Sequence, residues 1–357
     1  MLPERSAYAA NIYQSGHHVC MRDRDRYIVA AWLFLCAALA FSVVLVGGVT
    51  RLTRSGLSIV EWQPLIGILP PLSQEAWEAL FAKYRETPEF RQVNSNMTLE
   101  GFKGIFWWEY THRLLARAIG LVYVTPLLLF QWRKMLDTSL AAKLWAIFLL
   151  GALQGVLGWY MVKSGLVDDP KVSPVRLTAH LGLALVIFTA ELWIALQLLS
   201  PRVNPFEKLP LALPYLILAM ALSGGMVAGL RAGYAYNTFP LMNGELVPPE
   251  LLLLDPWWHN FLYNMATVQF VHRAFFWLIA LVVVLAWWHA RRRIASNVLL
   301  LAFAAQAALG ISTLLHGVPL PLAVAHQSGA VVLLAAAVWS AHSAGTWPAM
   351  RTVHASA

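Results

Sequence analysis

The sequence has 357 residues, of which 59% are hydrophobic and only 12% are charged, and its mean hydropathy is +0.59. Soluble domains carry about a quarter charged residues, so this composition excludes an ordinary soluble enzyme, and it excludes a disordered chain as well. The formal net charge of +8 comes from basic residues scattered between apolar runs, which is typical of membrane topology and argues against a nucleic-acid partner. Two cysteines, Cys20 and Cys36, are too few for a disulfide framework or a thiolate metal site.

Eight apolar stretches are long enough to cross a bilayer, because a transmembrane helix needs roughly 20 apolar residues. They are predicted at about 27–49, 107–131, 141–162, 177–199, 210–230, 266–290, 296–315 and 321–343. The long first loop, residues 51–106, is large enough to form a lid, and Ser73 followed by Glu75 and Ala76 predicts a helix start within it. The expected fold is an all-α integral membrane protein with eight transmembrane helices.

The short loops predict which side of the membrane each helix end faces. Basic residues gather before the first span and after the second, fourth and sixth: Arg22, Arg24, Arg26, Arg133, Lys134, Lys143, Arg202, Lys208, Arg291, Arg292 and Arg293. Acidic residues gather in the opposite loops: Asp168, Asp169, Glu245, Glu250 and Asp255. Because positively charged loops stay on the cytoplasmic side, we expect both termini in the cytoplasm.

The second half of the chain repeats motifs of the first half in the same order, at offsets that fall from 177 to 146 residues. The matched motifs are Gly47-Gly48 with Gly224-Gly225, Arg54 with Arg231, Glu109-Tyr110-Thr111-His112-Arg113 with Gln269-Phe270-Val271-His272-Arg273, Gln154 with Gln306, and His180 with His326. Because each half has an even number of spans, the repeat is parallel. We therefore expect two pseudo-symmetric four-helix bundles, 27–199 and 200–343, between a cytoplasmic segment 1–26 and a cytoplasmic tail 344–357.

Four histidines fall early in the second, fourth, sixth and eighth spans: His112, His180, His272 and His326. These spans all run inward, so the four imidazoles are expected in the outer leaflet, one to two turns or roughly 6–10 Å below the surface. Ionisable residues at that depth are costly and usually functional. A single histidine of this kind more often serves helix packing, but four at repeat-related positions favour ligation.

Facing helices that contribute one histidine each can hold a porphyrin by its two axial positions, so the pattern predicts two haem sites side by side. A copper or non-haem iron site stays open, although it would normally need a third ligand. Haems at one depth argue against simple electron transfer across the membrane.

The repeat is broken beside one site, where Glu109 corresponds to Gln269. Glu109 lies three residues before His112 and therefore on the same helix face, as a proton acceptor or an electrostatic stabiliser would. A glutamate that simply favours the positive end of a helix dipole is the alternative. Five arginines are candidate contacts for haem propionates, with solvation or snorkelling as the alternative: Arg51, Arg54, Arg113, Arg231 and Arg273.

Several stretches, spread from about residue 30 to 343, resemble the haem A synthase family in the form shared by proteobacteria and mitochondria. They are Val60-Glu61-Trp62-Gln63-Pro64 with Pro70-Pro71, Pro88-Glu89-Phe90, Phe106-Trp107-Trp108-Glu109-Tyr110-Thr111-His112-Arg113, Gly158-Trp159-Tyr160-Met161-Val162-Lys163-Ser164-Gly165-Leu166, Asn237-Thr238-Phe239-Pro240-Leu241-Met242 and His326-Gln327. The paired loop cysteines of the Gram-positive branch are missing here, so a redox role for them does not carry over.

The resemblance implies that a ring methyl group of haem O, at C8, is oxidised by two successive hydroxylations to the formyl group of haem A, which cytochrome oxidase uses. It implies a haem b cofactor on His272 and His326, and the substrate between His112 and His180 with Glu109 near the reacting methyl. Further implications are a bacterial inner membrane, haem O synthase as upstream partner and an electron acceptor that the sequence does not identify. The alternatives are a dihaem b electron-transfer protein, a haem carrier and, more remotely, a transporter.

Overall fold

The computed structural model describes residues 21–62, 67–167, 169–201 and 208–344. Within these residues the chain forms helices and no β-strand, and its one β-bridge joins Met242 and Glu245. Eight helices are long and apolar enough to cross a membrane, which confirms the predicted all-α class and number of spans. They are α2 (Asp23–Leu52), α5 (Leu99–Trp132), α6 (Thr138–Lys163), α7 (Pro174–Leu199), α8 (Lys208–Gly229), α10 (Met265–Ala290), α11 (Ile294–Leu315) and α12 (Leu320–Ser343).

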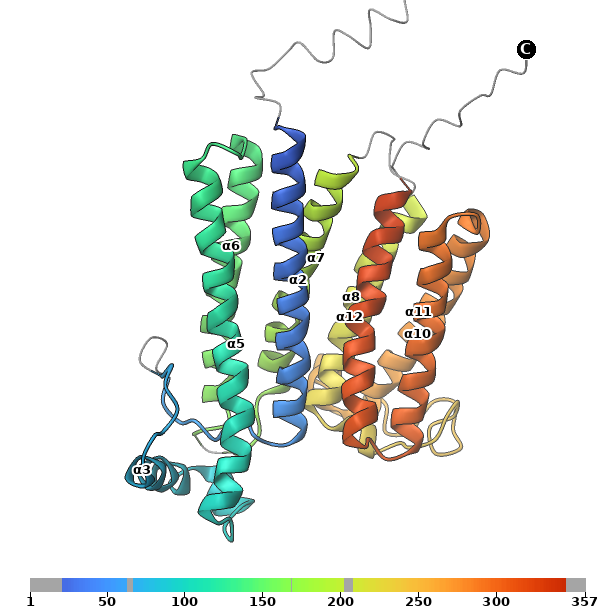
Figure 1. Ribbon diagram of the computed structural model, residues 1–357. Coiled ribbons are helices and arrows are strands. Elements are labelled where there is room, and N and C mark those ends of the chain that lie inside the picture. Colours follow the sequence, from blue (N-terminus) through green and yellow to red (C-terminus); the bar gives the residue numbers. More distant parts are fainter. Residues whose placement is uncertain (1–20, 63–66, 168, 202–207, 345–357) are drawn as a thin grey trace, which may run out of the picture.

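The eight helices run side by side with alternating direction, so that α2 begins and α12 ends at the same end of the molecule, the top in Figure 1. The basic segments that precede α2 and follow α5 and α10 lie at this end. Most of the acidic loop residues lie at the other end, on the connections after α6 and α8. Arg202, Asp168 and most of the two terminal segments fall outside the described residues.

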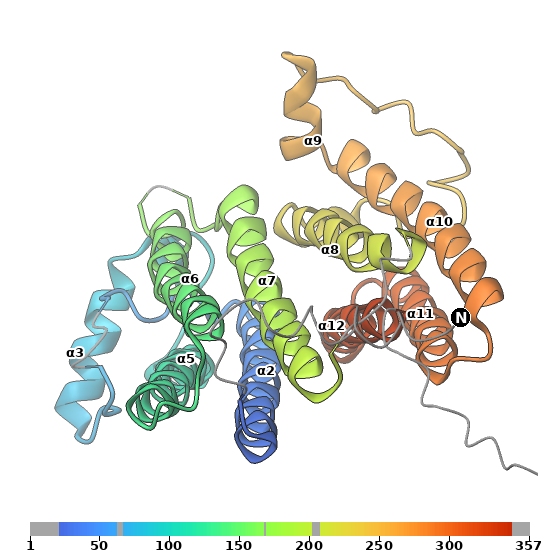
Figure 2. The same cartoon turned by 90° about the horizontal axis from the view of Figure 1, so that it is seen from above.

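In each half four helices pack in a ring. The contacts run from α2 to α5, α6, α7 and back to α2, and in the same order from α8 to α10, α11, α12 and back to α8. Figure 2 shows the two rings next to each other, with α7 of the first ring and α12 of the second on the sides that face each other. This contact order agrees with a duplicated four-helix unit, and the pseudo-symmetry of the two halves stays a prediction.

The seam between the rings depends on small residues, as helix packing in membranes generally does. Contacts across it join α7 to α8 and α12, and α12 to α2. A Cβ atom on Gly48 of α2 would overlap the Gln327 amide of α12, whose Nε2 donates to the Val44 carbonyl at 2.7 Å. At the matching place, a Cβ on Gly225 of α8 would lie 3.0 Å from Oγ1 of Thr178 on α7.

The connection between α2 and α5, for which the name lid is kept, contains α3 (Gln74–Arg85) and α4 (Pro88–Gln92). The predicted start of its first helix is confirmed, because the Ser73 side chain accepts a hydrogen bond from the Ala76 amide at 3.2 Å. Both α3 and the lower part of α5 project beyond the other helices in Figure 1. The lid packs on α5 through an aromatic cluster, and its most buried members are Tyr84, Phe102, Phe106 and Tyr110.

The helix that contains the second predicted span begins eight residues before the expected residue 107, since α5 begins at Leu99. The Thr98 hydroxyl caps it by accepting from the Gly101 amide at 3.3 Å. Hydropathy misses these turns because they carry Glu100 and Lys103. The apolar side of these first turns of α5, which includes Phe102, packs against the lid. The lid connection is therefore 53–98 rather than 51–106.

Candidate functional site

The four histidines occupy two opposite pairs of helices. In the first ring α5 and α7 both pack against α2 and α6, so His112 and His180 extend from opposite corners. In the second ring α10 and α12 have the same relation, with His272 and His326. The imidazoles of each pair are near enough to interact electrostatically. The chain thus brings the histidines together in the pairs that the repeat predicted.

Three of the histidines lie six or seven residues after the start of their helices, within the predicted one to two turns. His112 lies 13 residues after the start of α5. The difference arises because α5 begins inside the lid, before it enters the ring. Counting residues from the helix start therefore overstates the depth of His112.

Each histidine packs against a glycine of a neighbouring helix. A Cβ on Gly47 would lie 2.9 Å from Nε2 of His112, and one on Gly158 would lie 2.8 Å from Cε1 of His180. In the second ring, the corresponding distances are 3.2 Å from Gly224 to His272 and 2.7 Å from Gly310 to His326. Real Cβ atoms essentially never approach closer than 3.0 Å. The four glycines are repeat-related as the histidines are, so the space for each imidazole is built the same way twice.

Hydrogen bonds from neighbouring helices hold the backbone of one histidine in each ring. The Gln154 amide donates to the His180 carbonyl at 2.9 Å, and the Gln306 amide donates to the His326 carbonyl at 2.9 Å. These two glutamines correspond in the repeat. A third contact has no counterpart: Nδ1 of His272 lies 2.8 Å from the Ser223 hydroxyl, which donates to the Met220 carbonyl at 2.7 Å.

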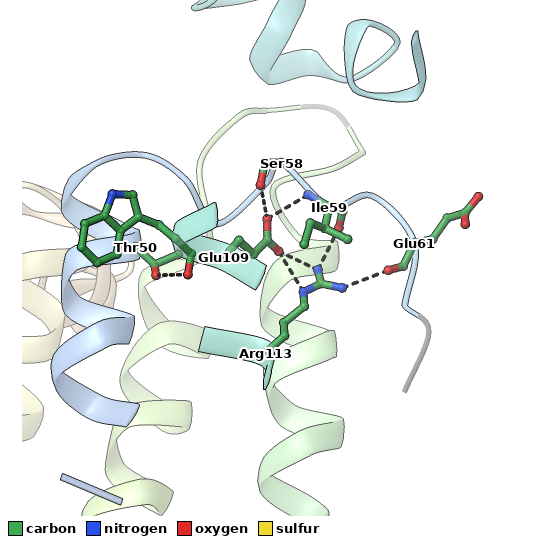
Figure 3. A network of polar contacts seen from close by, with 7 residues as sticks. Thr50, Ser58, Ile59, Glu61, Glu109 and Arg113 are labelled. Atoms are coloured by element: carbon green, nitrogen blue, oxygen red, sulfur yellow. Dashed lines mark hydrogen bonds and ion pairs between the residues drawn. The ribbon is translucent and has the colours of Figure 1, made fainter. Parts of the chain in front are cut away.

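Glu109 is buried, with 3% of its surface exposed, and its carboxylate is held by a network of four hydrogen bonds (Figure 3). Oε2 accepts from the Ser58 hydroxyl at 2.7 Å and from the Ile59 amide at 2.8 Å. Oε1 accepts from Nη2 of Arg113 at 2.6 Å and from its Nε at 3.1 Å. A carboxylate has about four acceptor positions, so this one is fully occupied.

The second ring repeats the framework of this network without its charge. Arg113 also donates to the Ile59 carbonyl at 2.8 Å, and Arg273 donates to the Tyr236 carbonyl, which corresponds to it, at 3.0 Å. Gln269 donates to the same Tyr236 carbonyl at 3.1 Å. Its Oε1 and Nε of Arg273 are both buried without a partner among the described residues. The Glu-to-Gln difference thus removes the ion pair, while the bond from the arginine to the Ile59 or Tyr236 carbonyl is kept in both rings.

The remaining predicted arginines lie at the ends of α2 and α8, near the seam. Arg51 donates to the Ala228 carbonyl of the other half. Arg54 and Arg231, which correspond in the repeat, both adopt a left-handed backbone with φ of 55°. Such a conformation is unusual for residues other than glycine and terminates the helix before each of them.

Comparisons with known proteins agree with this architecture. A family model described as a cytochrome oxidase assembly protein, COX15-CtaA, matches residues 30–338. A protein named heme A synthase from Nitrosospira multiformis is 55% identical over 329 residues, covering 88% of this chain and 92% of the relative. Proteins of the same name from Nitrosomonas eutropha and Parvibaculum lavamentivorans are 54% and 46% identical, covering 87% and 90% of this chain and 92% and 95% of the relatives. The chain belongs to the haem A synthase family.

Membership in the haem A synthase family makes haem the group to test against these sites. Nδ1 of His180 and of His326 is buried without a hydrogen-bond partner within the described chain. No group of three or more His, Cys, Asp or Glu side chains that could hold a metal ion occurs in the same part of the chain. Two imidazoles per ring and no third ligand suit a haem iron, which the porphyrin already binds by four nitrogens, better than copper or non-haem iron.

Sequence reasoning missed a second polar layer, deeper in the first ring. Cys36, Tyr123 and Glu191 are all buried, and Tyr123 donates to the Leu144 carbonyl at 2.9 Å. Each lies eleven residues, about 16 Å along its helix, from Gly47, His112 and His180 respectively. The repeat places three apolar residues with 0% exposure at the same positions of the second ring: Leu213, Val283 and Ala337. Comparing polar with apolar residues at repeat-related positions would have revealed this layer.

The lid contributes another buried acid, Glu89, which the sequence singled out only as part of a family motif. It is 4% exposed, and the Tyr84 hydroxyl donates to it at 3.3 Å. Desolvation, together with the nearby charge of Glu109, raises the pKa of Glu89 to about 7, although the Tyr84 hydrogen bond and the charges of Arg54 and Arg231 oppose the rise. The lid therefore presents an acid that changes charge near neutral pH.

Proposed function

We propose that this chain is a haem A synthase that oxidises the C8 methyl group of haem O to a formyl group through two successive hydroxylations. The observation that carries the proposal is the pair of matching histidine–glycine sites, only one of which has a buried carboxylate. In this proposal one haem is bound without change and the other is oxidised. Both sites therefore need the same histidine ligands, and only the reacting site needs the carboxylate. Membership in the haem A synthase family supports the same reaction.

In this proposal the first ring binds the substrate. His112 and His180 approach the iron of haem O from opposite faces, and the packing of Gly47 and Gly158 against them sets the direction of each imidazole. A prenylated porphyrin is soluble in lipid, so a site between membrane helices can load it laterally.

Glu109 is the catalytic residue of this proposal. Removal of two electrons and one proton from the ring methyl leaves a cationic carbon, and a fixed negative charge stabilises it before water adds. The four hydrogen bonds to Glu109 favour this electrostatic role, because they hold the carboxylate in place and leave it no acceptor position for an incoming proton. Arg113 positions the carboxylate through two of those bonds.

The second ring would hold haem b, with His272 and His326 as the residues that bind its iron. When bound, haem b supplies one-electron oxidation and reduction at its iron. The Ser223 hydroxyl accepts from Nδ1 of His272, since it already donates to Met220, and this leaves Nε2 of the ring for the iron. Arg51, Arg54, Arg113, Arg231 and Arg273 are the proposed contacts of the haem propionates.

We place the protein in the bacterial inner membrane, with the basic end of the helices and both termini in the cytoplasm. The histidine sites and the lid then face the outer compartment. Haem O synthase is the proposed supplier of the substrate, since its product is the compound that this chain consumes. A respiratory electron acceptor would take the electrons that the methyl group loses.

The test is pigment extraction from a bacterial host that lacks its own haem A synthase and expresses this chain together with a haem O synthase. We expect haem A and haem b in the purified protein. The variant Glu109→Gln should keep haem b and haem O and make no haem A, whereas the exposed control Glu100→Gln should match the wild type. Two haem b groups without haem O or haem A would instead indicate an electron-transfer protein, and unchanged haem O a carrier.

A further inference from the structure

Water that adds to an oxidised methyl group must lose a proton. The proposed function gives Glu109 the task of stabilising the cation, so the residue that receives this proton has still to be identified. Glu109 accepts four hydrogen bonds, two of them from the Arg113 guanidinium. A proton on it would have to displace one of these donors. Every acceptor position of Glu109 is therefore occupied, and a water molecule at the substrate finds no free lone pair on this carboxylate.

Glu89 offers the acceptor capacity that Glu109 lacks. In the described part of the chain its side chain takes one hydrogen bond, from the Tyr84 hydroxyl. Tyr84 in turn accepts from the Asn94 amide at 2.8 Å, so the three residues form a chain that ends at the Glu89 carboxyl. Tyr84 is fully buried, in the aromatic cluster that seals the lid against α5. The acid is thus held in a buried part of the lid.

The charged groups around Glu89 come from both rings. Glu109 lies on α5, Arg54 follows α2, and Arg231 follows α8, and all three interact electrostatically with Glu89. Tyr84 of α3 is the remaining titratable neighbour, and its own pKa is raised by burial. Protonation of Glu89 removes its repulsion with Glu109, while ionisation is favoured by the two arginines. The balance of these effects lets one proton move on and off at neutral pH.

We propose that Glu89 is the proton acceptor of the substrate site, an inference that rests on the proposed function. The step is R–CH2⁺ + H2O + Glu89–COO⁻ → R–CH2OH + Glu89–COOH, in which R–CH2⁺ is the oxidised methyl group of the substrate. The new C–O bond forms to water, one O–H bond of that water breaks, and its proton moves to the carboxylate. Glu109 keeps its charge and its hydrogen bonds throughout.

The test compares Glu89→Gln with Glu86→Gln, a neighbouring exposed acid of the same lid, in isolated membranes that contain haem O. We expect conversion by Glu89→Gln to fall about 100-fold with haem content unchanged, in the range typical of a lost general base. Wild-type conversion should rise with pH through about 7 and level off, because only the ionised Glu89 accepts a proton. The Glu89→Gln rate should not show this rise.

Two further measurements do not depend on turnover. Infrared difference spectroscopy should show a carboxyl C=O band that disappears with a midpoint near neutral pH and that Glu89→Gln lacks. Tyr84→Phe removes a hydrogen bond that lowers the pKa of Glu89, so it should move that midpoint to higher pH. If the wild type makes haem A and Glu89→Gln converts at a rate within twofold and with the same pH profile, Glu89 is not the acceptor. If the wild type makes no haem A, the proposed function itself is wrong.

Discussion

Nδ1 of His272 lies 2.8 Å from the Ser223 hydroxyl, whereas the residue that corresponds to Ser223 in the first ring is Val46, whose side chain has no polar group to offer His112. A histidine ligand whose second nitrogen is held keeps one orientation and one tautomer. This relationship suits a resident cofactor in the second ring and an exchangeable substrate in the first.

Ser223→Ala should weaken haem b binding about 10- to 100-fold, because loss of such outer contacts typically costs that much in ligand affinity. The measurement is the haem b content of the purified protein during dilution or competition with apomyoglobin. Ser42→Ala is the matched control, since within the described residues Ser42 bonds to the Ala38 carbonyl of its own helix alone. Equal haem retention in both variants would contradict the role of Ser223.

Gly158→Ala should displace the His180 imidazole, because the added carbon would lie 2.8 Å from Cε1. We expect at least tenfold less haem O bound, measured by pigment extraction, with haem b unchanged. Gly155→Ala on the same helix meets nothing within 4 Å and should behave as the wild type. A normal substrate load in Gly158→Ala would show that this packing does not set the imidazole.

Gln269→Glu should create in the second ring the ion pair of the first, since Nε of Arg273 and Oε1 of Gln269 are buried without partners in the described chain. We expect thermal unfolding at a higher temperature by a few degrees, because a hydrogen bond to a charged group contributes roughly 1.5–3 kcal/mol while the lost bond from Gln269 to the Tyr236 carbonyl contributed roughly 1 kcal/mol. The variant should still hold unmodified haem b. If the double variant Gln269→Glu and Glu109→Gln still forms haem A, the reaction takes place in the second ring, which contradicts the proposed assignment.

Glu89→Gln should be more stable than the wild type near pH 7.5 and equally stable near pH 4.5. The pKa of Glu89 rises from 4.5 to about 7 on folding, so the unfolded chain releases this proton first as pH increases. The wild type therefore loses stability through this window, by up to roughly 3 kcal/mol, and the amide does not. Unfolding temperatures of both proteins at several pH values measure this, and parallel curves would contradict it.

The sequence predicted the membrane helices well because hydropathy reports directly on contact with lipid. It failed at the start of α5, where residues such as Phe102 are buried against the lid instead, between Glu100 and Lys103. The pairing of the histidines followed from the repeat, since a duplicated unit must place His112 and His272 alike. Their role as ligands stays a prediction.

What the sequence did not reveal were contacts made by side chains from distant segments. Nothing near Glu109 in the chain indicates that Ser58 and Ile59 would reach it. The sequence showed Glu89 only as part of a family motif. In the fold it accepts a hydrogen bond from Tyr84 and interacts electrostatically with an arginine of each half. Burial of this kind depends on tertiary packing, which local patterns do not encode.

The hydrogen bonds across the seam constrain how the two proposed haems can exchange electrons. Arg51 binds a carbonyl of the second half, and Gln327 binds a carbonyl of the first. Because these bonds run in both directions, the rings would keep a constant iron-to-iron separation while pigment enters or leaves the first ring. Electron tunnelling rates fall steeply with distance. These hydrogen bonds would therefore keep the rate of electron transfer between the two proposed haems the same throughout the catalytic cycle.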